Sequence, residues 1–252
     1  MIDKGLIRRN FSRHAARYDA HARVQDRVGR DLLALCPAGG VEAVLDVGCG
    51  TGTWTGLLRD RYATARITAL DLSGAMLAEA RAKLGTDRIR YVAGDIERDP
   101  LPGTFDLIGS NACFQWLEDP GAVLARCHAA LRPCGRLVFS AFGPGTFAEL
   151  AGALGRIMDG PVALSASAFR DGAGYRALLE PLFDRVSVDR VCVPQVYGSA
   201  WSLLRAIKYT GTTGRGLFGR RLGRSQIAAL EDLIPRPSVT YEVFLCMARK
   251  GD

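Results

Sequence analysis

The chain has 252 residues, of which 48% are hydrophobic and 23% are charged. These values are typical of a soluble globular protein, and they exclude collagen, a coiled coil and wholesale disorder. No run approaches the roughly 18 unbroken apolar residues of a membrane helix, and residues 1–13 lack the apolar core of a secretory signal. Seven cysteines, none in a Cys-x-x-Cys pair, argue against a disulfide framework or zinc knuckle and predict a reducing cytoplasm.

Positive charge is concentrated in two segments. The whole sequence carries 33 Lys and Arg against 26 Asp and Glu, a net charge of +7. Residues 1–30 carry eight basic and three acidic side chains, and residues 201–224 carry six basic and no acidic ones. Such segments are either solvated faces or surfaces for an anionic partner, which would be nucleic acid, an acidic protein or an acidic substrate. The sequence has no RNA-binding motif and no interleaving of aromatic with basic residues, so nucleic acid is not expected.

Hydrophobic periodicity predicts the elements along the chain. Apolar residues three or four apart from Ile7 to Ala22 predict a helix over residues 5–35, which Pro37 ends. Short apolar runs then alternate with amphipathic stretches, and Ser73 and Gly85 are suited to cap one of the helices. The predicted strands are residues 41–47, 65–70, 89–92, 105–109, 135–142, 185–193 and 239–248; the predicted helices are residues 53–62, 73–85, 121–131 and most of 199–233.

This alternation of strands and helices predicts an α/β fold. Because parallel strands need helical crossovers, we expect a doubly wound, seven-stranded, mostly parallel sheet covered by helices on both faces. We expect a single domain over residues 1–252. Its parts are a helical N-terminal cap at residues 1–36, a core at residues 41–142 and a late helical insertion at residues 199–233.

The sharpest local signal is the sequence VLDVGCGTG at residues 44–52. It predicts a strand running into a glycine loop that opens a helix, where the backbone can approach a ligand and free N–H groups point outward. Such a loop suits a nucleotide-like ligand that bears a carboxylate or phosphate. It differs from the dinucleotide fingerprint, because Thr53 stands where a third glycine is needed, and from a P-loop, because no Gly-Lys-Ser/Thr follows.

Aspartates at the ends of later strands support a nucleotide site. Asp71 ends the second predicted strand, where a carboxylate can accept both ribose hydroxyls of an adenosine. Asp95 follows the third strand and is placed to accept from the adenine amino group, with Leu72 and Ile96 flanking the ring. One aspartate after a strand is more often a turn or cap residue. Three at successive strand ends, with Asp46 in the glycine loop segment, favour the nucleotide interpretation.

The pattern D-x-G-x-G-x-G followed by Asp71 and Asp95 resembles the class I S-adenosylmethionine-dependent methyltransferases over residues 41–142. The resemblance implies a Rossmann-like fold, S-adenosyl-L-methionine as cofactor, and a methyl-transfer face formed after the fourth strand. Residues 110–116 contain no Asn-Pro-Pro-Tyr, the signature expected for methylation of base amino groups. The implied cofactor-binding residues are Asp46, Gly48, Gly50, Gly52, Asp71, Leu72, Met76, Asp95, Ile96, Asn111 and Gln115.

Four segments flanking this core carry a further resemblance. They are NFSRHAARYD at residues 10–19, SAFGPGTFAEL at 140–150, LRAIKYTGT at 204–212 and TYEVF at 240–244. They resemble a narrower family, the malonyl-acyl-carrier-protein O-methyltransferases of biotin synthesis. The resemblance implies methyl transfer to the free carboxylate of a malonyl thioester on acyl-carrier protein, or on malonyl-CoA, giving the methyl ester that primes pimeloyl synthesis. It also implies that the insertion is a lid over the substrate.

The implied reaction needs no general base, because a carboxylate is already ionised at neutral pH. Alignment and exclusion of water are sufficient sources of catalysis. Tyr18 and Lys208 are the candidate catalytic residues, a hydroxyl and a cation that would hold the acceptor carboxylate, and the apolar neighbours of Lys208 predict that it faces inward. The alternatives are a packing role for Tyr18 and a solvated Lys208. The three histidines are scattered, so no metal site is expected.

Two other functional interpretations stay open at this point. One is another methyltransferase of the same fold that acts on a free carboxylic acid or a quinone ring. The other is a cofactor-binding regulator or an RNA-binding module, against which the complete cofactor motif argues. We expect a cytoplasmic monomer without membrane contact, in which the basic residues of the insertion, including Arg215, Arg220, Arg221 and Arg224, dock the acidic carrier protein.

Overall fold

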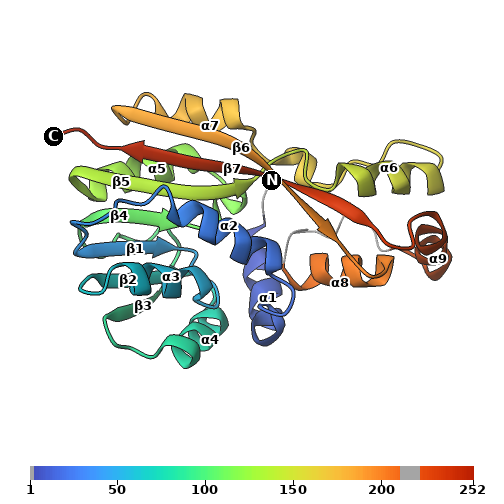
Figure 1. Ribbon diagram of the computed structural model, residues 1–252, viewed down its shortest axis with the longest axis horizontal. Helices are drawn as coiled ribbons and strands as arrows, with labels where there is room; N and C mark the ends of the chain where they lie inside the picture. Colours follow the sequence, from blue (N-terminus) through green and yellow to red (C-terminus); the bar gives the residue numbers. More distant parts are fainter. Residues whose placement is uncertain (1–2, 211–221) are drawn as a thin grey trace.

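The computed structural model describes residues 3–210 and 222–252. They form a seven-stranded sheet in the order β3-β2-β1-β4-β5-β7-β6 (Figure 1). The first five strands in this order, β3, β2, β1, β4 and β5, pair in parallel, whereas β7 is antiparallel to both β5 and β6. The predicted doubly wound, mostly parallel sheet is therefore confirmed. The strands are β1 (Ala43–Val47), β2 (Arg66–Asp71), β3 (Ile89–Ala93), β4 (Phe105–Ser110), β5 (Leu131–Phe142), β6 (Arg185–Val196) and β7 (Ser238–Arg249).

Helices cover both faces of the sheet, because successive strand residues point to opposite sides. Val44 of β1 packs into a core with α2, α3 and α6, whereas its neighbour Leu45 packs into a second core with α5 and α7. Both side chains are fully buried. The helices are α1 (Lys4–His14), α2 (Arg23–Leu33), α3 (Thr53–Arg61), α4 (Gly74–Leu84), α5 (Pro120–Ala130), α6 (Ala148–Ile157), α7 (Gly172–Leu179), α8 (Ala200–Tyr209) and α9 (Arg224–Leu233).

The N-terminal region does not form the single helix predicted over residues 5–35, so that prediction is wrong. The helix α1 ends at His14, a short 3-10 turn follows, and α2 starts only at Arg23. The break lets Asp19 reach the glycine loop, where it accepts hydrogen bonds from Thr51 Oγ1 (2.5 Å) and from Lys83. A contact between distant segments has therefore overridden the local helical periodicity.

The late insertion is helical at both of its ends, as predicted. Leu203 and Ile207 of α8 and Leu230 of α9 are buried in the same core as α2 and α6. Residues 211–221, which include Arg215, Arg220 and Arg221, lie outside the described residues. Within residues 3–210 and 222–252, no helix has the length and apolar character needed to cross a membrane.

The sheet positions a site at one of its edges. The strands β1, β2, β3 and β4 are parallel, so their carboxyl ends meet there. The helix α1 lies across this edge, where Ser12 Oγ is 2.8 Å from Ser73 Oγ at the start of α4. Figure 1 shows α8 beside α1, and the two helices are in contact. The site is thus covered by α1, which α8 in turn contacts.

Candidate functional site

A pocket lies at the carboxyl ends of the parallel strands, beneath α1. Most of its wall is apolar, and its polar groups are few, as in sites that hold a small organic ligand. Eight of the predicted cofactor-binding residues line it: Gly48, Gly50, Asp71, Leu72, Met76, Asp95, Ile96 and Asn111. Tyr18, one of the two predicted catalytic residues, lines it as well.

Asp71 is held in this pocket by two backbone donors. Its Oδ2 accepts the N–H of Gly50 (2.9 Å), and its Oδ1 accepts the N–H of Ser73 (2.7 Å). Burial raises the pKa of Asp71, and these two N–H groups oppose the rise. Each carboxylate oxygen keeps a further lone pair for a ligand. The side chain is thus fixed in the pocket as an acceptor for hydroxyl groups.

The glycines of the loop have different physical roles. Gly50 has a φ of +55°, and a Cβ there would meet nothing within 4 Å, so this position borders the open space of the pocket. At Gly48 a Cβ would lie 2.4 Å from Cys113 Sγ, so glycine is required there by packing between protein segments. Gly52 lines neither this pocket nor the one beside it; its Cβ would lie 2.9 Å from that of Ala80.

Asp46 lines a second pocket, on the other side of the glycine loop. Its Oδ2 accepts from Thr55 Oγ1 (2.6 Å), but its Oδ1 is buried without a hydrogen-bond partner. Burial raises the pKa of Asp46 to about 7; the Thr55 bond lowers it and nearby Asp71 raises it further. A buried acceptor without a partner is costly, so this arrangement fits a ligand that brings a cationic donor.

Asn111 and Gln115 serve mainly to hold the backbone around the pocket. Asn111 lines both pockets, yet its Nδ2 donates to Gln25 O (2.9 Å) and its Oδ1 accepts from Ser140 Oγ (2.7 Å). Gln115 lines neither pocket; it is buried and donates to Ala112 O (2.7 Å). The amide of Gln115 thus stabilises the turn after β4.

Tyr18 stands where the two pockets meet, since it lines both. Burial raises its pKa, followed by the charges of Asp19 and Asp71, so the phenol stays protonated at neutral pH. The ring packs beside Phe11 of α1, with 6.1 Å between centroids. The hydroxyl is therefore a hydrogen-bond donor near the glycine loop.

Lys208 does not face inward, and that prediction is wrong. Its side chain is exposed and lines neither pocket. Leu203, Ala206 and Ile207 form the buried stripe of α8, and a residue directly after Ile207 points about 100° away from it. The Lys208 ammonium instead lies 5.9 Å from the Tyr209 ring.

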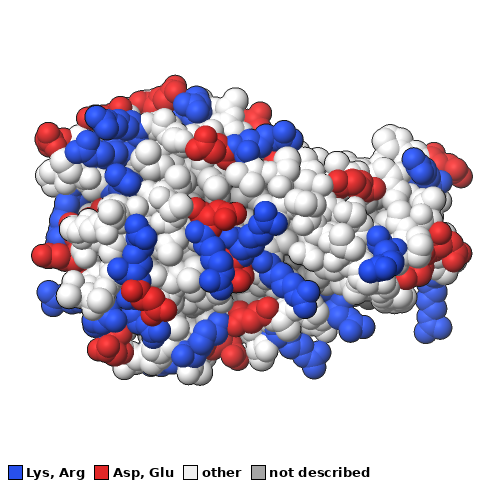
Figure 2. All heavy atoms as spheres, viewed as in Figure 1, with Lys and Arg blue, Asp and Glu red and all other residues white. Residues whose placement is uncertain are grey.

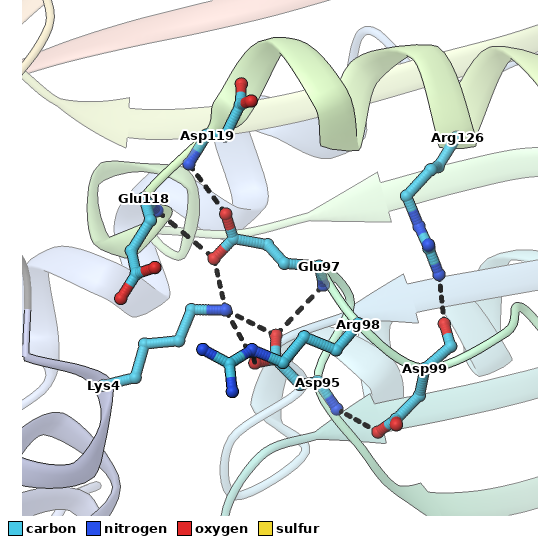
Figure 3. A network of polar contacts seen from close by, with 8 residues as sticks. All are labelled: Lys4, Asp95, Glu97, Arg98, Asp99, Glu118, Asp119 and Arg126. Atoms are coloured by element: carbon cyan, nitrogen blue, oxygen red, sulfur yellow. Dashed lines mark hydrogen bonds and ion pairs between the residues drawn. The ribbon is translucent and has the colours of Figure 1, made fainter.

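Lys4 is a pocket residue that sequence reasoning missed (Figure 3). Its ammonium lies 2.6 and 2.7 Å from the two Asp95 oxygens and also pairs with Glu97. Glu97 in turn accepts the N–H groups of Glu118 and Asp119, and Asp119 caps α5. The network joins the first turn of α1 to the loop after β3. A lone lysine near a chain start carries no motif, so the sequence offered no signal for this contact.

The described residues of the pocket include groups that can position a ligand. No cluster of His, Cys, Asp or Glu that could hold a metal ion is found in the described part of the chain. Burial raises the pKa of the Cys113 thiol to about 12 and that of Cys49 well above its usual range, so neither is a thiolate at neutral pH. What remains is a fixed acceptor at Asp71, a protonated Tyr18 and an apolar wall.

Comparisons with known proteins agree with this geometry. Residues 44–135 match the model of a methyltransferase domain family. A malonyl-[acyl-carrier protein] O-methyltransferase of Priestia megaterium is 40% identical, over 60% of this chain and 56% of that protein. One of Geobacter sulfurreducens is 38% identical over 88% of both chains. The structure of the N-methyltransferase NodS from Bradyrhizobium japonicum shares the fold, with a TM-score of 0.57, 18% identity and coverage of 98% of this chain and 99% of that one.

The relative from Geobacter sulfurreducens matches over most of both chains, well beyond the residues that the domain model covers. The chain therefore belongs to the malonyl-[acyl-carrier protein] O-methyltransferase family.

Proposed function

We propose that this protein transfers a methyl group from S-adenosyl-L-methionine to the free carboxylate of a malonyl thioester on acyl-carrier protein, giving the methyl ester that primes biotin synthesis. Family membership supports the reaction. The single observation that carries it is the paired pocket around the glycine loop, with Asp71 fixed on one side and the unpartnered Asp46 Oδ1 on the other.

The residues of the two pockets fit this cofactor. When bound, it supplies an electrophilic methyl group on a sulfonium. Asp71 accepts the ribose hydroxyls, Leu72 and Ile96 flank the adenine, and the Gly50 backbone leaves room for the ligand. Asp46 is placed to pair with an ammonium group, because its buried Oδ1 has no partner. Asp95 accepts from Lys4 through both carboxylate oxygens, and this contact holds it in place at the adenine end.

The acceptor needs alignment rather than activation. Its carboxylate is ionised at neutral pH, so no proton has to be removed. Tyr18 donates a hydrogen bond toward the junction of the pockets, which orients one carboxylate oxygen without neutralising the nucleophile. The apolar side chains of α1, among them Ile7 and Phe11, exclude water from the reacting groups.

The carrier protein is proposed to dock on the face formed by α1, α2 and α8. Figure 2 shows lysine and arginine side chains gathered there, with some acidic ones between them. The two basic segments of the sequence meet at this face, because Arg17 donates to Tyr209 Oη (3.2 Å). Trp201 of α8 is 54% exposed and adds an apolar contact. The insertion at residues 199–233 would serve as the lid, and the free cysteines agree with a cytoplasmic location.

The deciding experiment measures transfer of labelled methyl from the cofactor to malonyl carrier protein, with mass spectrometry to confirm the ester. Methylation of the carrier-bound thioester at a rate well above that of free malonate is expected. Preferential methylation of a free carboxylic acid or a quinone would instead place the protein with another acceptor of the same fold. An absence of transfer to any malonyl thioester would overturn the proposed function.

A further inference from the structure

A third pocket lies on the protein surface, between the turn before α2, the end of β6 and the first turns of α8. None of the predicted site residues lines it. Its lining residues include His21, Arg23, Tyr197 and Arg205. We call it the outer pocket.

The outer pocket is positively charged and lacks a compensating acid. Arg23 and Arg205 line it, no Asp or Glu does, and neither arginine pairs with a carboxylate anywhere in residues 3–210 or 222–252. Burial lowers the pKa of His21, and the charges of Arg205 and Arg17 lower it further. Two unpaired guanidinium groups in one concavity attract an anion.

The groups around the arginines are held in place. His21 stacks on the Tyr209 ring at 4.6 Å, and Tyr209 also accepts from Arg17. On the other wall, the Tyr197 and Tyr241 hydroxyl oxygens are 2.8 Å apart. Because both walls are fixed by contacts between distant segments, the arginines project from a preformed frame.

The outer pocket is adjacent to the reaction site. Arg23 lines both the outer pocket and the second pocket, and the second pocket shares Tyr18, Gly48, Gly50 and Asn111 with the cofactor pocket. A long, narrow substrate with its anionic group at Arg23 and Arg205 could therefore extend inward toward Tyr18.

We propose that the outer pocket binds the phosphate of the phosphopantetheine arm that carries the malonyl thioester. This inference rests on the proposed function. Arginine is the residue best suited to phosphate, because its planar fork of donors matches two phosphate oxygens. The arm bears its phosphate at one end and the thioester at the other, so the phosphate stays at the surface while the malonyl group enters. The same phosphate chemistry is present in malonyl-CoA.

The kinetic test compares malonyl-phosphopantetheine with malonyl-pantetheine, which differ only in the phosphate. In the unaltered protein, we expect kcat/KM to be about tenfold or more higher for the phosphorylated thioester, as one or two charge-assisted bonds provide. Arg205→Ala and Arg23→Ala should each reduce this ratio to about three or less through KM. Arg205 lines neither of the two cofactor pockets, so Arg205→Ala should also leave kcat and malonyl-pantetheine methylation unchanged. The matched control is Arg27→Ala, an exposed arginine one turn further along α2 that lies outside the outer pocket. It removes the same charge and should keep the ratio.

A binding measurement separates failure of this inference from failure of the proposed function. Calorimetry with phosphopantetheine and with pantetheine, neither carrying an acyl group, should show the phosphate preference in the unaltered protein and its loss in Arg205→Ala. Inorganic phosphate alone should compete weakly. If both arginine variants keep the full ratio while the protein methylates malonyl thioesters, the outer pocket is not a phosphate site and the proposed function stands. If Arg27→Ala lowers the ratio as much as they do, the effect is general steering and the inference is wrong.

Discussion

Replacement of Lys4 by methionine tests the network at the adenine end of the pocket. The ammonium of Lys4 is shared by two carboxylates, those of Asp95 and Glu97. Lys4→Met keeps a flexible chain of similar length but leaves two acidic groups close together without their cation. We expect this variant to fold, to be less stable than the unaltered protein and to hold α1 less firmly over the pocket.

The size of the effect follows from burial. The side chains of Lys4, Asp95 and Glu97 are 14%, 14% and 10% exposed. Removal of one partner from a buried pair costs about 3–5 kcal/mol, whereas an exposed pair contributes about 0–1 kcal/mol. In Lys4→Met, Glu97 keeps two backbone donors and Asp95 keeps one. We therefore expect the free energy of unfolding to fall by about 2 kcal/mol. For a chain of this size that lowers Tm by about 4–8 °C.

The assay is urea unfolding at several pH values, with Arg176→Met as control. Arg176 pairs with Glu180 at 45% and 57% exposure, so this variant should change the free energy of unfolding by less than about 0.5 kcal/mol. Burial raises the pKa of Asp95, but the Lys4 bond, the Glu97 N–H and the neighbouring cations bring it below the usual value. Its contribution is thus lost only as pH falls through that lowered pKa.

In Lys4→Met the two carboxylates lie close together and mostly buried without Lys4, which favours their protonated forms. The loss of stability caused by Lys4→Met should therefore be largest at pH 7 and should shrink as pH falls toward about 4. If Lys4→Met is no more destabilising at pH 7 than the Arg176 control, the three side chains behave as a solvated surface pair. The reasoning from burial would then be refuted.

Four further outcomes are expected. Asp71→Asn should raise the calorimetric Kd for S-adenosyl-L-methionine about tenfold or more, because a charged acceptor becomes neutral; unchanged affinity would remove Asp71 from the site. Asp46 has a pKa raised to about 7, so its ionisation costs stability as pH rises toward 7, and Asp46→Asn should raise Tm of the ligand-free protein more at pH 8 than at pH 5. Equal shifts at the two pH values would contradict this. Tyr18→Phe should lower kcat with malonyl carrier protein and leave Tm nearly unchanged; equal turnover would make Tyr18 a packing residue. Gly50→Val should keep a normal far-ultraviolet spectrum and lose cofactor binding, whereas Gly48→Val should lower Tm, and the reverse order would show that the open space was assigned to the wrong glycine.

Features that depend on neighbouring residues are predictable from the sequence. The order and approximate bounds of all seven strands follow from local hydrophobic runs and turn residues. Ser73 caps α4 by accepting from Met76 N, and Gly85 ends that helix with a positive φ, as these residue types predict. The glycine loop and Asp71 were also predictable, because parallel strands bring their carboxyl ends to one edge of the sheet.

Features that depend on contacts between distant segments were not predictable from local sequence patterns. The predicted helix over residues 5–35 is broken because Asp19 binds Thr51, and Lys4 joins the pocket because α1 crosses the sheet edge to Asp95, 91 residues later. Lys208 points outward because the rest of α8 must bury its apolar stripe in the core. Periodicity identifies which face of a helix is apolar. The partners of its polar face depend on which distant segments the fold brings next to it, and a local sequence pattern carries no information about those segments.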